Sequence, residues 1–120
     1  NIQMNLKKPV IKNDRGYLVE FPVKDFNIKQ VNILFSYANT IRGNHFHKET
    51  EEYFYIINGK VSVTTTDVNT KEEKIFIVES GGYFHVYPYN LHVLKFIEDT
   101  HIMSFYSKEF DPKDTDIYQI

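Results

Sequence analysis

The sequence predicts an all-β protein, built as an antiparallel barrel of two sheets, and three observations carry this prediction. Hydrophobic residues recur with a period of two along most of the chain, which is the period of a half-buried strand. Short runs of this kind are separated by turn signals such as Asn58-Gly59 and Gly81-Gly82. No stretch has the pattern of a long helix. Short strands at such spacing are typical of sandwiches and barrels.

The expected strands follow one another at short intervals. Asn58-Gly59 is the residue pair that favours a two-residue hairpin turn, and 67–70 reads as a second turn. The stretch 111–116 reads as a loop or a short terminal turn. In the first strand Val31, Ile33, Phe35 and Tyr37 share one face, while Asn32, Leu34 and Ser36 share the other. We expect strands at residues 31–37, 52–57, 60–66, 74–78, 83–87, 92–97 and 101–107.

Composition limits the functions that the chain can have. Its 120 residues fit a single domain, 1–120, and the formal net charge of -2 argues against a non-specific nucleic-acid binder. No apolar run is long enough to span a membrane, and no secretory leader is evident. The absence of cysteine indicates a cytoplasmic protein. Because the sequence starts at Asn1, we keep open that it is part of a longer protein.

A cluster of histidines and one carboxylate predicts the chemistry. Residues i and i+2 of a strand point to the same side, so we expect His45 and His47 to face one cavity. Glu52 opens the next strand and offers an oxygen ligand, and His92 follows much later in the chain. Imidazoles with one carboxylate suit a divalent transition metal such as Zn, Fe, Mn or Ni. His45, His47 and Glu52 are therefore candidate ligands, with His92 as a third imidazole.

These residues match the pattern of a known family. His45-x-His47-x4-Glu52-x6-Gly59 resembles the first motif of the cupins, which are jelly-roll barrels of the double-stranded β-helix type. Gly82-x5-Pro88 followed by His92 resembles the second motif. The glycine usual two residues after the proline is Asn90 here. Asn tolerates the left-handed backbone, so we expect the turn to survive at this position.

Further segments resemble cupins of sugar-nucleotide metabolism. Arg42-Gly43-x-His45-x-His47-Lys48 is similar to the signature of small isomerases that move the keto group of dTDP-4-keto-6-deoxyhexoses between C3 and C4. The segment 14–18 is similar to a strand of sugar-nucleotide epimerases, and the tail 109–118 is similar to the end of capsular-polysaccharide cupin domains. The isomerases usually carry Gln near position 52 and work without metal, whereas Glu52 leaves room for one.

The resemblance implies an isomerase or epimerase acting on a nucleotide-linked 4-keto-6-deoxyhexose. In this hypothesis His45 or His47 removes a proton, because imidazole titrates near neutrality. Arg42 or a metal holds the developing enediolate, and Tyr37 donates a proton. Arg42 and Arg15 bind the nucleotide diphosphate. We expect the sugar-nucleotide cavity to be lined by Tyr37 and His85 as well.

Two alternatives stay open for the activity. The chain could be a non-catalytic metal- or sugar-binding domain of a larger polysaccharide-biosynthesis protein, or a metal-dependent dioxygenase, which uses similar ligands. We also expect a homodimer, because small barrels shelter edge strands against a partner. Residues 1–37 are those most expected to cross between the subunits.

Overall fold

The computed structural model describes residues 2–6, 11–21, 23–24 and 26–120, and for 2–6 it describes the backbone alone. Residues 1–37 were expected to cross between the subunits of a dimer, and of these, residues 1, 7–10, 22 and 25 lie outside the described part. Within that part the chain forms eleven strands and no helix, so no helix there is fit to cross a membrane. The strands are β1 (Ile2–Leu6), β2 (Ile11–Asn13), β3 (Gly16–Leu18), β4 (Gln30–Ser36), β5 (Ile41–His45), β6 (Glu52–Asn58), β7 (Lys60–Asp67), β8 (Glu73–Glu79), β9 (Gly82–Val86), β10 (Asn90–Phe96) and β11 (Thr100–Tyr106).

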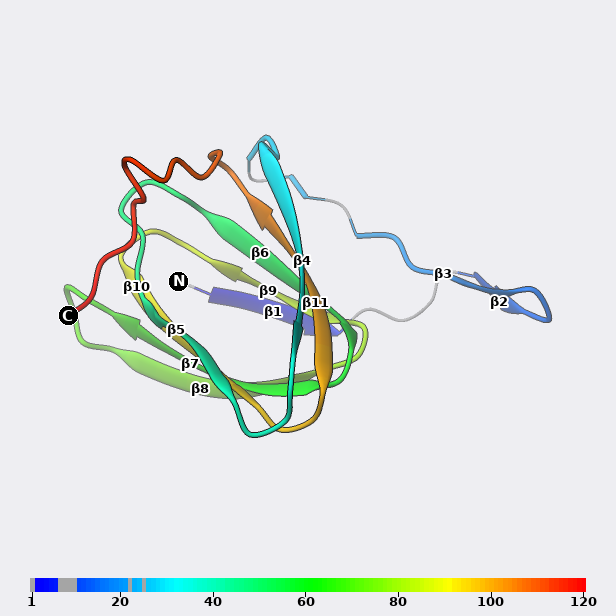
Figure 1. The fold of residues 1–120 in the computed structure, drawn as a ribbon. Coiled ribbons are helices and arrows are strands. Elements are labelled where there is room, and N and C mark those ends of the chain that lie inside the picture. Colours follow the sequence, from blue (N-terminus) through cyan, green and yellow to red (C-terminus); the bar gives the residue numbers. More distant parts are fainter. Residues whose placement is uncertain (1, 7–10, 22, 25) are drawn as a thin grey trace.

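Two antiparallel sheets face each other in the barrel (Figure 1). One has the strand order β1-β9-β6-β11-β4, and the other has the order β5-β10-β7-β8. Strands β4 and β5 are consecutive in the chain but lie at the edges of different sheets, so the chain changes sheet there. The prediction of an antiparallel double-sheet barrel is confirmed.

The hydrophobic core fills the space between the sheets. Alternate residues of β6, β7, β9 and β10 point inward, as the period of two predicts. Burial of these apolar side chains is the main driving force for closing the barrel. The buried core consists of Phe54, Ile56, Val61, Val63, Val78, Phe84, Val86, Leu94, Phe96 and Ile102.

All seven runs expected as strands are strands, with ends that move by one or two residues. The hairpin predicted at Asn58-Gly59 is wrong, because this turn takes the chain from β6 in one sheet to β7 in the other, and the two strands do not pair. Gly59 in the turn has a φ of 124°. A Cβ there would lie 2.3 Å from the Thr100 hydroxyl, which explains why glycine stands at this turn. The tail after β11 is irregular, as expected. Strands β1, β2, β3 and β5 go beyond the runs that periodicity identified.

The apolar face of β4 lies outside the barrel. Val31, Ile33 and Phe35 are exposed, whereas the intervening polar side chains point inward. The reason is a polar inner wall: the Asn32 amide donates to the Ser104 hydroxyl at 3.1 Å, and Arg42 Nε donates to the Ser36 hydroxyl. Period two therefore predicts the two faces of β4 without telling which face is buried.

Strands β2 and β3 form a separate hairpin that projects from the barrel (Figure 1). Every residue from Ile11 to Leu18 is exposed. A two-stranded hairpin with no packing partner is marginally stable in water. This hairpin therefore contributes little to the core that positions the site.

Candidate functional site

The end of β5 bends sharply beside β10. Gly43 and Asn44 both have left-handed backbones, with φ of 87° and 62°, and the β5–β10 register shifts between His92 and Val93. A Cβ at Gly43 would lie 2.6 Å from the carbonyl oxygen of His92, so glycine permits this close approach. The bend sets His45 directly across from His92.

His47 lies beyond the end of β5, so the expectation that one regular strand aligns His45 with His47 is wrong in detail. An isolated bridge pairs Phe46 with Tyr118 of the tail instead. The two imidazoles nevertheless face each other, with centroids 5.1 Å apart, while Phe46 packs away from them on Tyr89 and Tyr118. The tail, rather than strand alternation, thus holds His47 in place.

Three imidazoles converge inside the barrel. His45, His47 and His92 each offer a ligand nitrogen, and these nitrogens lie within 4.8 Å of one another. Glu52 joins them from β6, where its pairing with the core residue Val86 turns it inward. Its Oε1 lies 3.4 Å from Nε2 of His47 and 3.8 Å from Nε2 of His92. The structure therefore brings together the four residues that the sequence predicts as metal ligands.

Backbone carbonyls orient two of the rings. Nδ1 of His47 lies 2.8 Å from the carbonyl oxygen of Asp116, and Nδ1 of His92 lies 3.1 Å from that of Asn90. A carbonyl only accepts, so each Nδ1 carries the proton of the hydrogen bond. In a neutral ring this leaves a lone pair on Nε2, the atom that faces Glu52.

Burial and mutual repulsion keep two of the imidazoles neutral. Burial lowers the pKa of His92 to about 3, and the charge of His45 adds to this effect. Burial also lowers the pKa of His45, with a contribution from His47. Both rings are therefore free bases near pH 7 and are able to accept a proton or to bind a metal.

His47 and Glu52 influence each other's charge. Burial works against a charge on His47, but the nearby Glu52 carboxylate and the Asp116 carbonyl outweigh it, so the pKa of His47 is raised. Burial raises the pKa of Glu52, while His47 and Ser104 pull it back. Tyr106 stands opposite Glu52 across β6 and β11, and burial raises the pKa of its hydroxyl. Tyr106 therefore keeps its proton near neutral pH.

The donor set fits a divalent transition metal. Nε2 of His47 is buried and has no hydrogen-bond partner of good geometry in the described part of the chain. A buried nitrogen left in this way is costly unless it meets a ligand. Imidazole nitrogens with one carboxylate oxygen suit Zn, Fe, Mn or Ni. The residues that would hold the metal are His45, His47, His92 and Glu52.

Arg42 and Tyr37 lie at the junction of β4 and β5. Arg42 donates to Ser36 and lies 3.5 Å from the carbonyl oxygen of Phe35, while the Tyr37 ring packs against that of Phe35. These residues line a shallow pocket at the two sheet edges. The functional roles assigned to Arg42 and Tyr37 stay predictions.

Arg15 and His85 lie away from the histidine cluster. Arg15 is in the turn of the projecting β2–β3 hairpin (Figure 1). His85 alternates with the core residues Phe84 and Val86, so it is on the outer face of its sheet, 3.0 Å from Glu51. Neither residue lies beside the imidazoles of His45, His47 and His92, and the substrate-binding roles assigned to Arg15 and His85 stay predictions.

The turn before β10 has its left-handed residue at a different position from the one expected. The left-handed conformation occurs at Tyr89, with a φ of 63°, and not at Asn90. The Asn90 side chain instead donates to the carbonyl oxygens of Tyr87 and Pro88. The asparagine thus closes the turn through its amide and, through its own carbonyl, orients His92.

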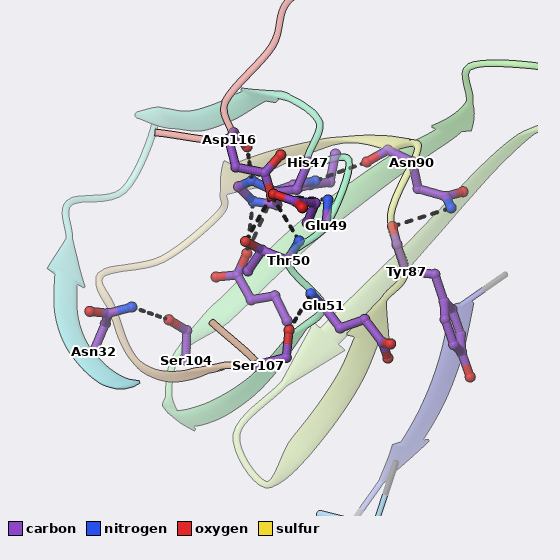
Figure 2. A network of polar contacts seen from close by, with 12 residues as sticks. Asn32, His47, Glu49, Thr50, Glu51, Tyr87, Asn90, Ser104, Ser107 and Asp116 are labelled. Atoms are coloured by element: carbon purple, nitrogen blue, oxygen red, sulfur yellow. Dashed lines mark hydrogen bonds and ion pairs between the residues drawn. The ribbon is translucent and has the colours of Figure 1, made fainter. Parts of the chain in front are cut away.

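Sequence reasoning missed Asp116, Ser104 and Tyr106 as neighbours of the site. Asp116 is buried and its carboxylate accepts hydrogen bonds from the loop that follows His47 (Figure 2). Burial alone would raise the pKa of Asp116, but these bonds hold it below the ordinary value. The contact joins residues 66 to 69 positions apart, which no local pattern reveals.

Comparisons with known proteins agree with this architecture. The model of the polysaccharide biosynthesis C-terminal domain family matches residues 11–118. A double mutant of the QdtA 3,4-ketoisomerase from Thermoanaerobacterium thermosaccharolyticum aligns with a TM-score of 0.82 and 24% identity, over 100% of this chain and 88% of that chain. The WlaRB TDP-quinovose 3,4-ketoisomerase from Campylobacter jejuni gives 0.85 and 18%, over 100% and 93%.

An epimerase structure also has this fold, with a similar TM-score and a similar sequence identity. The Mycobacterium tuberculosis rmlC epimerase aligns with a TM-score of 0.84 and 17% identity, over 99% of this chain and 68% of that chain. A search of curated protein sequences finds no match. The structural likenesses confirm the cupin jelly-roll fold. Because the family model spans nearly the whole chain, the protein belongs to the polysaccharide biosynthesis C-terminal domain family.

Proposed function

We propose that this protein is an isomerase or epimerase that acts on a nucleotide-linked 4-keto-6-deoxyhexose by histidine-mediated proton transfer. The convergence of His45, His47, His92 and Glu52 inside the barrel carries the proposal. The family description, which names polysaccharide biosynthesis, supports it. The fold relatives, whose names include 3,4-ketoisomerases of TDP-sugars and an epimerase, support it further.

Such a keto shift needs a base beside the sugar ring. The base removes the proton from the carbon next to the carbonyl, and the C–H electrons form the double bond of an enediolate. A proton then returns to the former carbonyl carbon, while the hydroxyl proton of the neighbouring carbon passes to the former carbonyl oxygen, and the keto group has moved by one position. His45 fits the role of base, because its ring is neutral near pH 7 and only half-buried.

Neighbouring groups would stabilise the charges that develop. Glu52 lies close enough to His47 and His92 to balance positive charge on either ring. Tyr106 keeps its hydroxyl proton and could donate a hydrogen bond to a developing oxyanion. Arg42, at the junction of β4 and β5, is our candidate for the nucleotide diphosphate, since a guanidinium matches phosphate oxygens.

A divalent metal, Zn, Fe, Mn or Ni, is part of the proposal as a possible cofactor. A metal held by His45, His47, His92 and Glu52 would supply a positive charge that stabilises anionic oxygen. Metal binding and proton transfer compete for the same imidazole nitrogens. An assay with and without a chelator therefore separates the two uses of the cluster.

One other function is favoured by a specific observation. The family is described as a C-terminal domain, which fits a sugar- or metal-binding accessory domain of a larger polysaccharide-biosynthesis protein. Such a domain would bind a TDP-sugar without converting it. It would need the same inner cavity but no base.

The test is to incubate the protein with TDP-4-keto-6-deoxyglucose in D2O and to follow the sugar by proton NMR. We expect solvent deuterium to enter the sugar at a ring carbon next to the keto group. His45→Asn should slow the exchange by about 10²–10⁴, the usual contribution of a general base. The matched control is His101→Asn, an exposed histidine of β11. Binding of the sugar without exchange would overturn the isomerase and favour the accessory domain.

We also propose that the protein is a cytoplasmic homodimer, formed over the outer face of β4. Val31, Ile33 and Phe35 are 48%, 73% and 37% exposed on an edge strand. The projecting β2–β3 hairpin of the same chain lacks core contacts, which favours a second copy as its packing partner. Light scattering should give a dimer that Ile33→Lys dissociates and that Ile75→Lys, on the exposed face of β8, does not. A monomeric wild type at micromolar concentration would contradict this.

A further inference from the structure

The chain after β11 returns to the histidine cluster. The tail runs past β6 and reaches the loop at residues 46–50, where Phe46 and Tyr118 form a backbone bridge. One pocket is lined both by His47 and by tail residues from Lys108 to Ile117. The tail therefore forms one wall around His47.

A single buried carboxylate attaches this tail to the loop. Oδ1 of Asp116 accepts from the backbone N–H of Lys48 at 2.8 Å. Oδ2 accepts from the N–H of Glu49 at 3.0 Å, the N–H of Thr50 at 2.8 Å and the Thr50 hydroxyl at 2.9 Å. Figure 2 shows the carboxylate above this loop. Hydrogen bonds to a charged acceptor are stronger than neutral ones, so they fix the residue firmly.

The same residue contacts His47 through its backbone. The carbonyl oxygen of Asp116 lies 2.8 Å from Nδ1 of His47. Asp116 has a left-handed backbone, with a φ of 52°, a conformation that Asp and Asn adopt more readily than most residues. The side chain holds the loop while this backbone turn aims the carbonyl at the ring.

We propose that Asp116 is the positioning residue that selects the tautomer of His47, with the proton on Nδ1 and the lone pair on Nε2. The side-chain anchor places the carbonyl, the carbonyl holds the proton, and Nε2 is left free to meet a metal or a sugar proton beside Glu52. The inference deepens the proposed function, because it names what orients one of its histidines. The tautomer itself exists with or without a substrate.

The test is the imidazole nitrogen spectrum of protein labelled with 15N-histidine, with a chelator present, at about pH 9, where free imidazole is neutral. We expect His47 in the wild type to carry its proton on Nδ1. A wild type with the proton on Nε2 overturns the proposal, and this outcome depends on no variant. In Asp116→Ala we expect the Nε2–H form to appear, while Asp114→Ala on the same tail should leave the spectrum unchanged.

Two further measurements separate positioning from a merely structural latch. Asp116→Ala should weaken Zn2+ binding by about 10–100-fold, the usual effect of losing a partner that orients a ligand. Asp116→Asn keeps one acceptor oxygen, so His47 in this variant should be mostly in the Nδ1–H form. This variant provides the test if Asp116→Ala fails to fold. A folded Asp116→Ala with an unchanged His47 tautomer would refute the positioning role. A wild type that has the Nδ1–H form of His47 but no keto transfer would instead count against the proposed function.

Discussion

Glu51 and Glu52 are neighbours in the sequence, yet each meets histidine on a different side of the same sheet. Glu52 points inward, where it lies within 4 Å of His47 and His92. Glu51 points outward and pairs with His85 at 3.0 Å. Glu51 directly precedes β6, and the alternation of successive side chains along an extended chain puts it on the opposite face from Glu52.

The surroundings of the two pairs differ more than the pairs themselves. The outer His85 is stacked between aromatic rings, with Tyr53 and Tyr87 centroids 4.2 and 4.0 Å away. The inner pair faces two further imidazoles, and the ligand nitrogens of the three rings lie within 4.8 Å of one another. A histidine–glutamate pair is thus a candidate reaction or metal site where further ligands gather, and a structural contact where aromatic rings fill the space.

The largest expected difference between the two sides is in metal affinity. Glu52→Gln removes the negative oxygen from the inner cluster and should weaken Zn2+ binding by about 100-fold or more, since even the loss of an orienting partner costs 10–100-fold. Glu51→Gln, one residue away, should leave the affinity unchanged. Isothermal titration calorimetry compares the two. An equal loss in both variants would remove the distinction between inner and outer pairs.

The pH dependence of stability should also come from the inner side. The pKa of His92 is about 3 when folded and near 6.5 when unfolded. As the pH falls below 6.5, the unfolded chain takes up a proton that folded His92 refuses, so the free energy of unfolding falls. The raised pKa of His47 acts oppositely: its contribution is present below pH 6.5 and is lost as the pH rises.

Urea unfolding at pH 7 and pH 5, with a chelator, measures this effect. Between pH 6.5 and 5, His92 should account for up to about 2 kcal/mol of the lost stability, at about 1.4 kcal/mol per pH unit. The His92→Gln variant should lack this part of the loss. His101→Gln, on the exposed face of β11, is the control and should keep the wild-type slope. A His92→Gln variant with the wild-type slope would show that this ring charges freely in the folded protein.

The smallest expected effect belongs to the outer pair. Glu51→Ala removes the carboxylate 3.0 Å from buried His85 and should cost about 1 kcal/mol of stability, because the carboxylate is partly exposed. Zn2+ affinity should not change. Glu49→Ala, which breaks the exposed pair with Lys108, should cost less. Thermal unfolding compares the stability lost in the two variants. If Glu51→Ala loses no more stability than Glu49→Ala, the outer contact with His85 does not stabilise the fold.

The sequence predicted what depends on local pattern. The strand periodicity and the spacing of His45, His47 and Glu52 are local, and the structure agrees with the fold that they imply. The turn at Asn58-Gly59 is also where the pattern puts it, but the strands beside it pair in different sheets and form no hairpin. The partnership with His92 came from family resemblance, since 47 positions separate it from His45. The side of β4 that is buried could not be predicted, because its apolar residues face outward.

Long-range contacts account for most of what was missed. Asp116 meets His47 from 69 positions away, and Tyr106 meets Glu52 only through the pairing of β6 with β11. The left-handed residue at the turn before β10 is Tyr89, although Asn90 is the residue type that favours that conformation. In each case tertiary packing overrides what local chemistry suggests.

The most direct test of the central claim, that the sugar nucleotide reacts at the inner cluster, uses the five histidines as probes. Protein labelled with 13C-histidine is titrated with TDP-4-keto-6-deoxyglucose, and the five imidazole Cε1–H signals are assigned by single substitutions. We predict that His45, His47 and His92 shift on binding, while His85 and His101 stay in place. Shifts at His85 with the three inner signals unmoved would contradict the account.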